Sequence, residues 1–223
     1  MGINERKERE KEHRREEIIS SAEKVFFEKG LQTATMDEIA ERAELGKSTL
    51  YLYYKSKEDL YLAVLLRGTE ILLQKFEEVL GSGGPTVRLI AGLGEAYYDF
   101  FKEYRNYFRM FYFFENPQIH KQVSAEMMDL CSISNGRIWD LIIRLIQKGM
   151  DEGIIQKSLN PKQIAVMLWS NANGLMRQMD REDSYWSERM GVDLEATLRL
   201  TYALLLESIM TDEAKEKYPE YVV

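Results

Sequence analysis

Apolar residues recur at intervals of three and four along most of the chain, a spacing that predicts amphipathic helices. The strict alternation of apolar and polar residues that marks a half-buried strand is almost absent, and the 223 residues include only 4 prolines. The pattern therefore predicts an all-α protein with short helices near the N-terminus and longer helices after them.

The N-terminal part is expected to form three short helices. A stripe of Ile18, Ala22 and Phe26 predicts a helix that ends near Gly30, because glycine commonly terminates helices. Thr35, followed by a glutamate three residues later, has the spacing of a capping box and predicts the start of a second helix. Two further helices are predicted, over residues 47–54 and 56–80.

The segment Gly81–Pro85 is the clearest break in the chain. Five helices are predicted after it, over residues 85–104, 105–115, 118–152, 161–180 and 193–211, followed by a charged tail. We therefore expect two domains. Residues 1–60 would hold the short helices with a charged N-terminal arm, and residues 61–223 a long connecting helix and a larger helical body.

Charge and composition limit the possible functions. The net charge is −7, and residues 1–60 hold 12 basic and 14 acidic side chains, so any DNA binding must come from a local cluster. A single cysteine cannot form an internal disulfide, and no run of about 18 apolar residues suggests a membrane span. The charged N-terminus is unlike a signal peptide. A cytoplasmic protein without membrane association is expected.

Two of the predicted short helices are joined by only three residues, Glu44 to Gly46. This spacing is typical of a helix-turn-helix, whose second helix enters the DNA major groove. The exposed side of the second helix would carry one ammonium and several hydroxyl groups, which suit phosphates and base edges. A helical hairpin with a solvated polar face has the same spacing, so spacing alone leaves both readings open.

The run from Arg15 to Leu60 resembles the DNA-binding domain of the TetR family of bacterial transcriptional regulators, most specifically in the order Lys-Ser-Thr-Leu-Tyr-Leu-Tyr-Tyr-Lys-Ser-Lys-Glu-Asp-Leu over residues 47–60. The resemblance implies a homodimer that binds a palindromic double-stranded DNA operator through its third helix and responds to a small-molecule effector. It implies DNA contacts by Thr35, Lys47, Ser48, Thr49, Tyr51, Tyr53 and Lys57.

The sequence departs from the family pattern in the turn. Glu44 stands where the family usually has glycine, and Gly46 stands where it usually has a polar N-cap such as serine. A residue other than glycine at positive φ costs about 1 kcal/mol, so either Glu44 is strained or the turn is shifted. Glu44 also places a negative charge near the expected DNA.

Residues 97–114 contain 11 of the 25 aromatic residues. Such a segment is typical of a packed core, and it also suits an adaptable apolar ligand pocket. The resemblance favours a pocket for an apolar or aromatic effector. Its candidate lining residues are Tyr97, Phe101, Tyr104, Phe108, Phe111, Met127, Trp139 and Trp169.

The last two long helices carry apolar stripes that suit a dimer interface built as a four-helix bundle. The candidates are Leu168, Ala172, Leu175, Leu198, Leu205 and Ile209. The same stripes would serve equally as intrachain core, and only the resemblance favours the dimer.

The N-terminal arm alternates basic and acidic residues from Glu5 to Glu17. An arginine of the arm can reach the minor groove, or the arm can be a helical extension held by ion pairs between neighbouring turns. The second reading is the simpler one.

Enzyme signatures are incomplete. Gly46, Lys47 and Ser48 match the end of a P-loop, but Glu41 occupies the earlier glycine position and no strand precedes it. His13 and His120 lack metal-ligand neighbours at helical spacing. No catalytic residue, metal site or cofactor is predicted.

Together with the resemblance, these observations predict a ligand-responsive, sequence-specific transcriptional regulator that is not an enzyme. A repressor released from its operator by a small apolar or aromatic effector fits best. The alternative is a helical small-molecule-binding protein whose helix-turn-helix no longer binds DNA.

Overall fold

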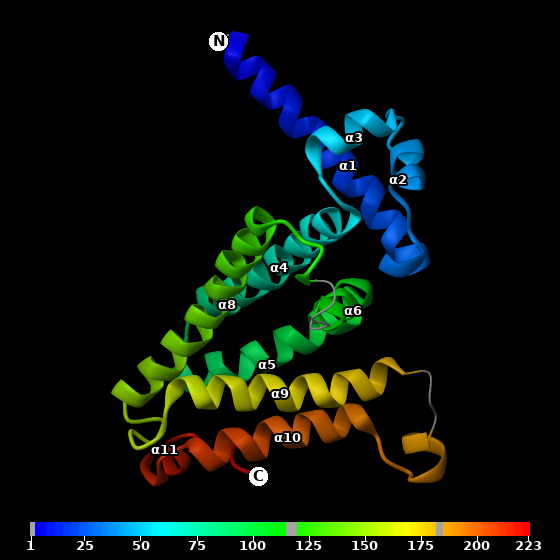
Figure 1. Ribbon diagram of the computed structural model, residues 1–223. Coiled ribbons are helices and arrows are strands. Elements are labelled where there is room, and N and C mark those ends of the chain that lie inside the picture. Colours follow the sequence, from blue (N-terminus) through cyan, green and yellow to red (C-terminus); the bar gives the residue numbers. More distant parts are fainter. Residues whose placement is uncertain (1–2, 115–119, 182–184) are drawn as a thin grey trace. The chain divides into compact units, whose positions relative to one another are not determined.

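A computed structural model describes residues 3–114, 120–181 and 185–223, which form helices joined by short turns (Figure 1). The α-helices are α1 (Ile3–Thr33), α2 (Met36–Arg42), α3 (Lys47–Tyr53), α4 (Lys57–Gly81), α5 (Thr86–Glu103), α6 (Arg105–Phe114), α8 (Ala125–Asp151), α9 (Pro161–Asp180), α10 (Leu194–Ile209) and α11 (Asp212–Lys217). A π-helical turn covers Tyr185–Arg189 and a 3₁₀ turn covers Pro219–Tyr221. The described residues contain one isolated β-bridge, Ile155 with Met210, and no strand. The all-α prediction is confirmed.

The chain divides into two compact units that are interleaved in sequence. The N-terminal unit comprises residues 1–70 and 106–135, and the C-terminal unit comprises residues 71–105 and 136–223. The chain therefore passes between the units three times, within α4, at the start of α6 and within α8. The functional domains predicted over residues 1–60 and 61–223 stay a prediction.

Several helix starts follow directly from capping residues. The Thr35 hydroxyl accepts a hydrogen bond from the Glu38 amide (3.3 Å), and the Glu38 carboxylate accepts one from the Thr35 amide (3.1 Å). The predicted capping box is therefore present. Asn160 caps α9 ahead of a proline at the first helical position, and Asp193 caps α10.

Three predicted boundaries differ from the structure. The first helix begins at Ile3, since the charged arm is helical, and it bends at Gly30 (φ 73°) before ending at Thr33. The helix expected from residue 118 begins at Ala125, and its first two predicted residues, 118–119, lie outside the described residues, as does residue 115, the predicted end of the helix before it. The expected tail contains α11, which the Thr211 hydroxyl caps. Its one short turn has too few apolar residues to produce a periodic signal.

The core of the N-terminal unit joins α1 to α2, α3, α4 and α6. Fully buried side chains include Ile18, Ile39, Leu50, Leu60 and Phe108. Tyr107 of α6 lies edge-on to Phe27 of α1 (5.0 Å between ring centroids), and its hydroxyl donates to Glu23 (2.7 Å). A Cβ added to Gly68 of α4 would lie 2.6 Å from the Tyr107 ring, so glycine permits this close approach.

The core of the C-terminal unit lies between α5, α9 and α10. Tyr97 of α5 donates to the side-chain oxygen of Asn173 of α9 (3.1 Å), and the buried Asn173 in turn donates to the Trp169 carbonyl (2.9 Å). Tyr202 of α10 lies against Gly94 of α5. These contacts satisfy the buried polar groups of Tyr97 and Asn173.

We expect Gly68→Ala to destabilise the protein by about 1–3 kcal/mol, because the new methyl group would overlap the fixed end of the Tyr107 side chain. Urea unfolding at one protein concentration would measure the change. Gly136→Ala is the matched control, since nothing lies within 4 Å of its added Cβ, and it should be neutral or stabilising. Equal effects of the two substitutions would contradict the close packing at Gly68.

Candidate nucleic-acid interface

The α2–α3 pair has the arrangement of a helix-turn-helix. Leu50 is fully buried and Tyr54 nearly so, and together they fix the inner face of the seven-residue α3. The opposite face is solvent-exposed, with Tyr51 44% exposed. The buried Ala40 on α2 leaves room for the helices to approach each other. The structure therefore presents the polar side chains of α3 to solvent together with the apolar Leu52, which is 84% exposed.

The turn between the helices takes the strained form considered from the sequence. Glu44 has φ 54°, in the left-handed region, and is the one residue other than glycine at positive φ among those described. Its amide donates to the Glu41 carbonyl (3.0 Å), and the Leu45 amide donates to the Ala40 carbonyl (2.9 Å). Gly46 occupies the N-cap of α3 and supplies no side-chain cap. The turn thus keeps its geometry at the cost of strain at Glu44.

Four of the seven predicted DNA-contact residues gather around one hollow of about 370 Å³ in the N-terminal unit: Thr35, Lys47, Tyr51 and Lys57. The other three, Ser48, Thr49 and Tyr53, lie on the same short α3, with Ser48 exposed and Thr49 and Tyr53 half-buried. All seven belong to the N-terminal unit.

Lys57 has a structural role that its position in the sequence does not reveal. Its ammonium donates to the carbonyls of Leu31 (2.8 Å), Gln32 (3.2 Å) and Ala34 (3.0 Å). An ammonium has three donors, so these carbonyls engage all of them. The cation thereby satisfies the exposed carbonyl end of α1 and joins it to the start of α4. A phosphate contact by Lys57 stays a prediction, and it would require this cap to open.

Lys47 is held by an acidic neighbour. Its ammonium lies 2.7 Å from the Asp37 carboxylate, and the hydrogen bond with Asp37 raises the pKa of Lys47 above its ordinary value. Both side chains are exposed, so water and salt screen the pair and it is easily exchanged. A phosphate can therefore replace Asp37 as the partner of Lys47.

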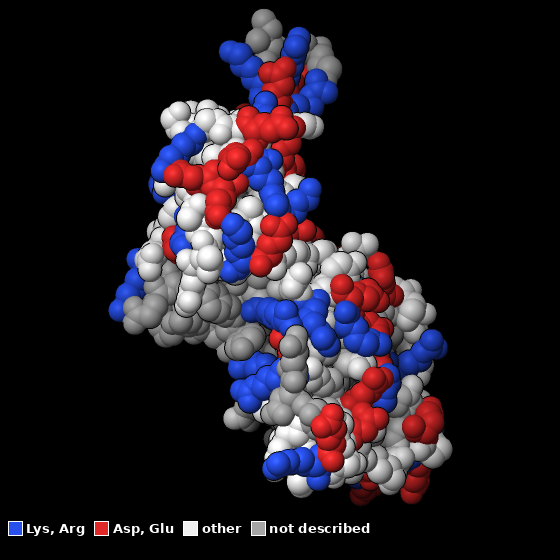
Figure 2. All heavy atoms as spheres, turned by 90° about the vertical axis from the view of Figure 1, so that its right-hand side faces the viewer, with Lys and Arg blue, Asp and Glu red and all other residues white. Residues whose placement is uncertain are grey.

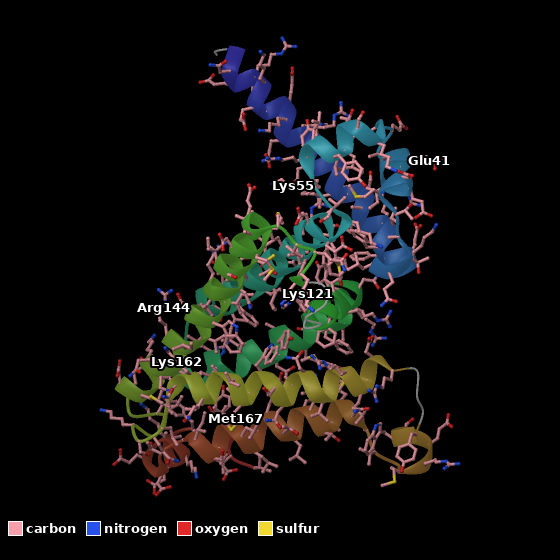
Figure 3. The ribbon with its side chains drawn as sticks, viewed as in Figure 1. Glu41, Lys55, Lys121, Arg144, Lys162 and Met167 are labelled. Atoms are coloured by element: carbon pink, nitrogen blue, oxygen red, sulfur yellow. The ribbon has the colours of Figure 1, made fainter. Side chains whose placement is uncertain are left out.

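Sequence reasoning missed six further residues that line the hollow: Met36, Asp37, Lys55, Ser56, Glu58 and Gln122. Figure 3 marks Lys55 in the turn between α3 and α4, Glu41 on α2 and Lys121 in the segment before α8. Gln122 is far away in sequence, and no local pattern connects it to the helix-turn-helix.

The segment before α8 is attached to the start of α4 by two hydrogen bonds. The Ser56 hydroxyl donates to the Gln122 carbonyl (3.3 Å), and the Ser124 amide donates to the Asp59 carboxylate (2.7 Å). Asp59 is buried. Ser56 also caps α4, since its hydroxyl accepts from the Asp59 amide (3.0 Å). The lining of the hollow thus includes chain from both segments of the N-terminal unit.

The predicted pocket residues divide between the two units. Tyr97, Phe101, Tyr104, Trp139 and Trp169 belong to the C-terminal unit, and Phe108, Phe111 and Met127 belong to the N-terminal unit. Trp139 and Trp169 lie edge to face, 5.7 Å apart, whereas Phe101 and Phe108 are buried in their own cores. Their role in binding a ligand stays a prediction.

The predicted dimer residues face largely inward. Ala172, Leu198 and Ile209 are buried within the chain, and Leu168, Leu175 and Leu205 are half-buried. Other apolar residues of α9 and α10 face outward, namely Val166 (51% exposed), Leu200 (49%) and Leu204 (49%). These three are called the outward α9–α10 face below. The apolar stripes predicted the helices correctly but did not distinguish their inner sides from their outer sides.

Other chemistry is sparse in the part of the chain that the structure describes. It contains no group of three or more His, Cys, Asp or Glu side chains that would hold a metal ion. Burial raises the pKa of the Cys131 thiol to about 11, so the reactive thiolate is disfavoured at neutral pH. None of the described helices has the length and apolarity to cross a membrane.

Comparison with known proteins gives a family match over the part of the chain that contains α2 and α3. The family of bacterial regulatory proteins called tetR matches residues 18–64. The HTH-type transcriptional activator FasR of Mycolicibacterium smegmatis is 32% identical over 135 residues, which cover 60% of this chain and 61% of FasR. This chain therefore matches less than two thirds of the length of that relative. The HTH-type transcriptional repressor KstR2 of the same organism is 22% identical, over 66% of this chain and 70% of KstR2.

Solved structures share the fold over most of the chain. PfmR, a TetR family transcriptional regulator from Thermus thermophilus, has a TM-score of 0.64 at 21% identity, covering 85% of this chain and 97% of PfmR. The regulator FadR from Bacillus subtilis, solved in complex with stearoyl-CoA, has a TM-score of 0.64 at 18% identity, covering 86% of this chain and 98% of FadR.

Glu44→Gly should stabilise the protein by about 1 kcal/mol, because glycine adopts the left-handed backbone of the turn without strain. Urea unfolding would measure the gain. Glu44→Ala removes the same charge but keeps the Cβ, and should give no comparable gain. If alanine stabilised as much as glycine, the cause would be charge rather than strain.

Proposed function

We propose that this chain, which belongs to the TetR family of bacterial regulatory proteins, represses transcription by binding a palindromic DNA operator as a homodimer and leaves it when a small apolar or aromatic effector binds. The observation that carries the proposal is the polar, solvent-facing side of α3, held in place by the buried Leu50. This is the presentation that a recognition helix needs to enter the major groove.

DNA contact is assigned to six of the seven predicted residues, and Lys57 is assigned a positioning role. Lys47 exchanges Asp37 for a phosphate, and Thr35 approaches the backbone at the start of α2. The hydroxyl groups of α3 read base edges in the major groove; they belong to Ser48, Thr49, Tyr51 and Tyr53. Lys57 acts chiefly by joining α1 to α4, so its contribution to binding is mainly one of position.

Dimerisation is assigned to the outward α9–α10 face. Val166, Leu200 and Leu204 are large apolar side chains that water reaches in the single chain. Gly174, about two turns after Val166 on α9, has nothing within 4 Å of its Cβ position, which leaves room for a partner helix. Two helices from each subunit would form a four-helix bundle. Such a dimer would present two α3 helices to half-sites about 34 Å apart.

The effector is proposed to bind within the aromatic and methionine-rich helical body. FadR, whose fold this chain shares, was solved with stearoyl-CoA, which supports an effector with a long apolar chain. The aromatic candidates Tyr97, Tyr104, Trp139 and Trp169 of the C-terminal unit would supply apolar surface. The relatives differ in the sign of regulation, because KstR2 is called a repressor and FasR an activator. Repression by this chain is therefore a separate part of the proposal.

Coupling would use the three passages of the chain between the units. Effector binding that favours a different arrangement of the C-terminal unit changes the path of α4 and α8, because both helices belong to both units. The start of α4 carries Ser56 and Asp59, which bind the segment before α8. A shift in population between two such arrangements would alter the operator affinity of α3.

The proposal is tested by selecting purified protein against a random double-stranded DNA pool and measuring affinity for the enriched duplex by anisotropy. Enrichment of a palindrome is expected, and Lys47→Ala with Tyr53→Ala should weaken its binding at least tenfold by removing a phosphate contact and a base contact. Lys162→Ala with Tyr185→Ala, which removes the same residue types from the C-terminal unit, should bind normally. No enrichment by folded, dimeric protein would favour the alternative of a helix-turn-helix without DNA binding.

For the dimer, Leu200→Glu with Leu204→Glu should convert the protein to a monomer at micromolar concentration, because the interface would bury four carboxylates per dimer. Analytical ultracentrifugation would measure the mass. Leu130→Glu with Ile133→Glu changes an equally exposed apolar pair on α8 and should leave the dimer intact. A dimer that survives the first variant would assign the interface elsewhere.

A further inference from the structure

The N-terminal half of α1 extends as a lone helix beyond α3 (Figure 1). We call residues 3–15 the N-terminal arm; from residue 4 to residue 14 every side chain is exposed. Six basic and four acidic residues lie on the arm, and Figure 2 shows charges of both signs beside one another there. Most of the basic charge is offset, so any strong preference for a partner must come from how the charges are distributed around the helix.

Helical geometry aligns two lysines of the arm with the buried face of α1. Lys7 and Lys11 precede the fully buried Ile18 by 11 and 7 residues. Measured around the helix axis, each of the two lysines therefore points within about 20° of the direction of Ile18. Every carboxylate of the arm points about 80° or more away from that direction. The arm therefore carries a purely cationic line on the side that, further along α1, packs against the helix-turn-helix.

These two lysines also differ from their neighbours in pairing. Arg6 lies 2.9 Å from Glu10, Arg14 lies 2.8 Å from Glu17, and Arg15 lies 3.6 Å from Glu12. Within the described residues no carboxylate lies within 4.0 Å of the ammonium of Lys7 or Lys11. Their charges are free for an external anion.

The C-terminal end of the arm lies beside the end of α3. Tyr54 directly follows α3, and the charges of Arg15, Glu16 and Glu12 act on its phenol, whose pKa burial raises to about 12. Residues 12–16 of α1 thus lie beside the end of α3. From there Lys11 and Lys7 extend the cationic line by about 6 and 12 Å along the helix axis. The line is continuous with the candidate nucleic-acid interface.

We propose that the N-terminal arm is a second DNA-binding element, in which Lys7 and Lys11 contact backbone phosphates next to the half-site that α3 occupies. This inference rests on the proposed DNA binding and adds residues outside the helix-turn-helix. Charge complementarity selects the occupant, because regularly spaced phosphates match two ammonium groups one helical turn apart. Contacts of this kind raise affinity on any sequence and do not read bases.

The test compares Lys7→Gln with Lys11→Gln against Arg6→Gln with Arg9→Gln, which removes the same charge from the opposite side of the arm. Anisotropy titrations would use the selected duplex with and without flanking base pairs, between about 50 and 200 mM salt. A dimer carries two arms and therefore four of these lysines, so their loss should reduce the slope of log K against log salt by about 4. Equivalently, lowering the salt over that range should strengthen wild type roughly a hundredfold more than the variant.

The arginine control should keep the wild-type slope, and Lys7→Arg with Lys11→Arg should restore it. Removing the flanking base pairs should abolish the difference between wild type and the lysine variant. Equal slopes for all variants, or equal losses in the arginine control, would overturn the proposal. If the protein selects no duplex, the proposed function is contradicted instead. The salt slopes of the same variants, measured on a random duplex of equal length, would then decide the role of the arm.

Discussion

The burial of Leu50 and Tyr54 determines where every polar group of α3 points. A seven-residue helix does not persist by itself in water, since helix nucleation costs more than so few hydrogen bonds return. The helix exists because its inner face is part of the core that Ile18 and Ile39 complete. Its outer face is therefore a consequence of core packing, and the strain at Glu44 is tolerated because the same core holds the turn in place.

The start of α4 is the second point on which the arrangement depends. Within four residues, Ser56 binds the Gln122 carbonyl, Lys57 binds the carbonyl end of α1, and Asp59 binds the amide of Ser124. A change in direction of α4 would act on all of these contacts together. The interface is thus sensitive to α4 without any requirement that a ligand approach α3, which is the physical basis of the proposed coupling.

Features that depend on residues near one another in the sequence could be predicted, and contacts between distant segments could not. The Thr35 capping box and the all-helical class depend on neighbouring residues and follow from spacing. The carbonyl partners of Lys57 and the place of Gln122 beside the hollow depend on chain segments brought together only by folding. Periodicity likewise marks a helix face as apolar without saying whether its own chain or a second chain covers it, as at Leu198 and Leu200.

The interleaving of the two units has a consequence for how such proteins diversify. Residues 106–135 complete the core of the N-terminal unit, where Tyr107 lies against Gly68 and bonds to Glu23. A contiguous exchange of the first 60 or 70 residues would therefore replace one side of this packed core and leave the other side behind. Point changes on the exposed side of α3 leave this shared core intact, so they alter the surface of the N-terminal unit with less disruption of its packing.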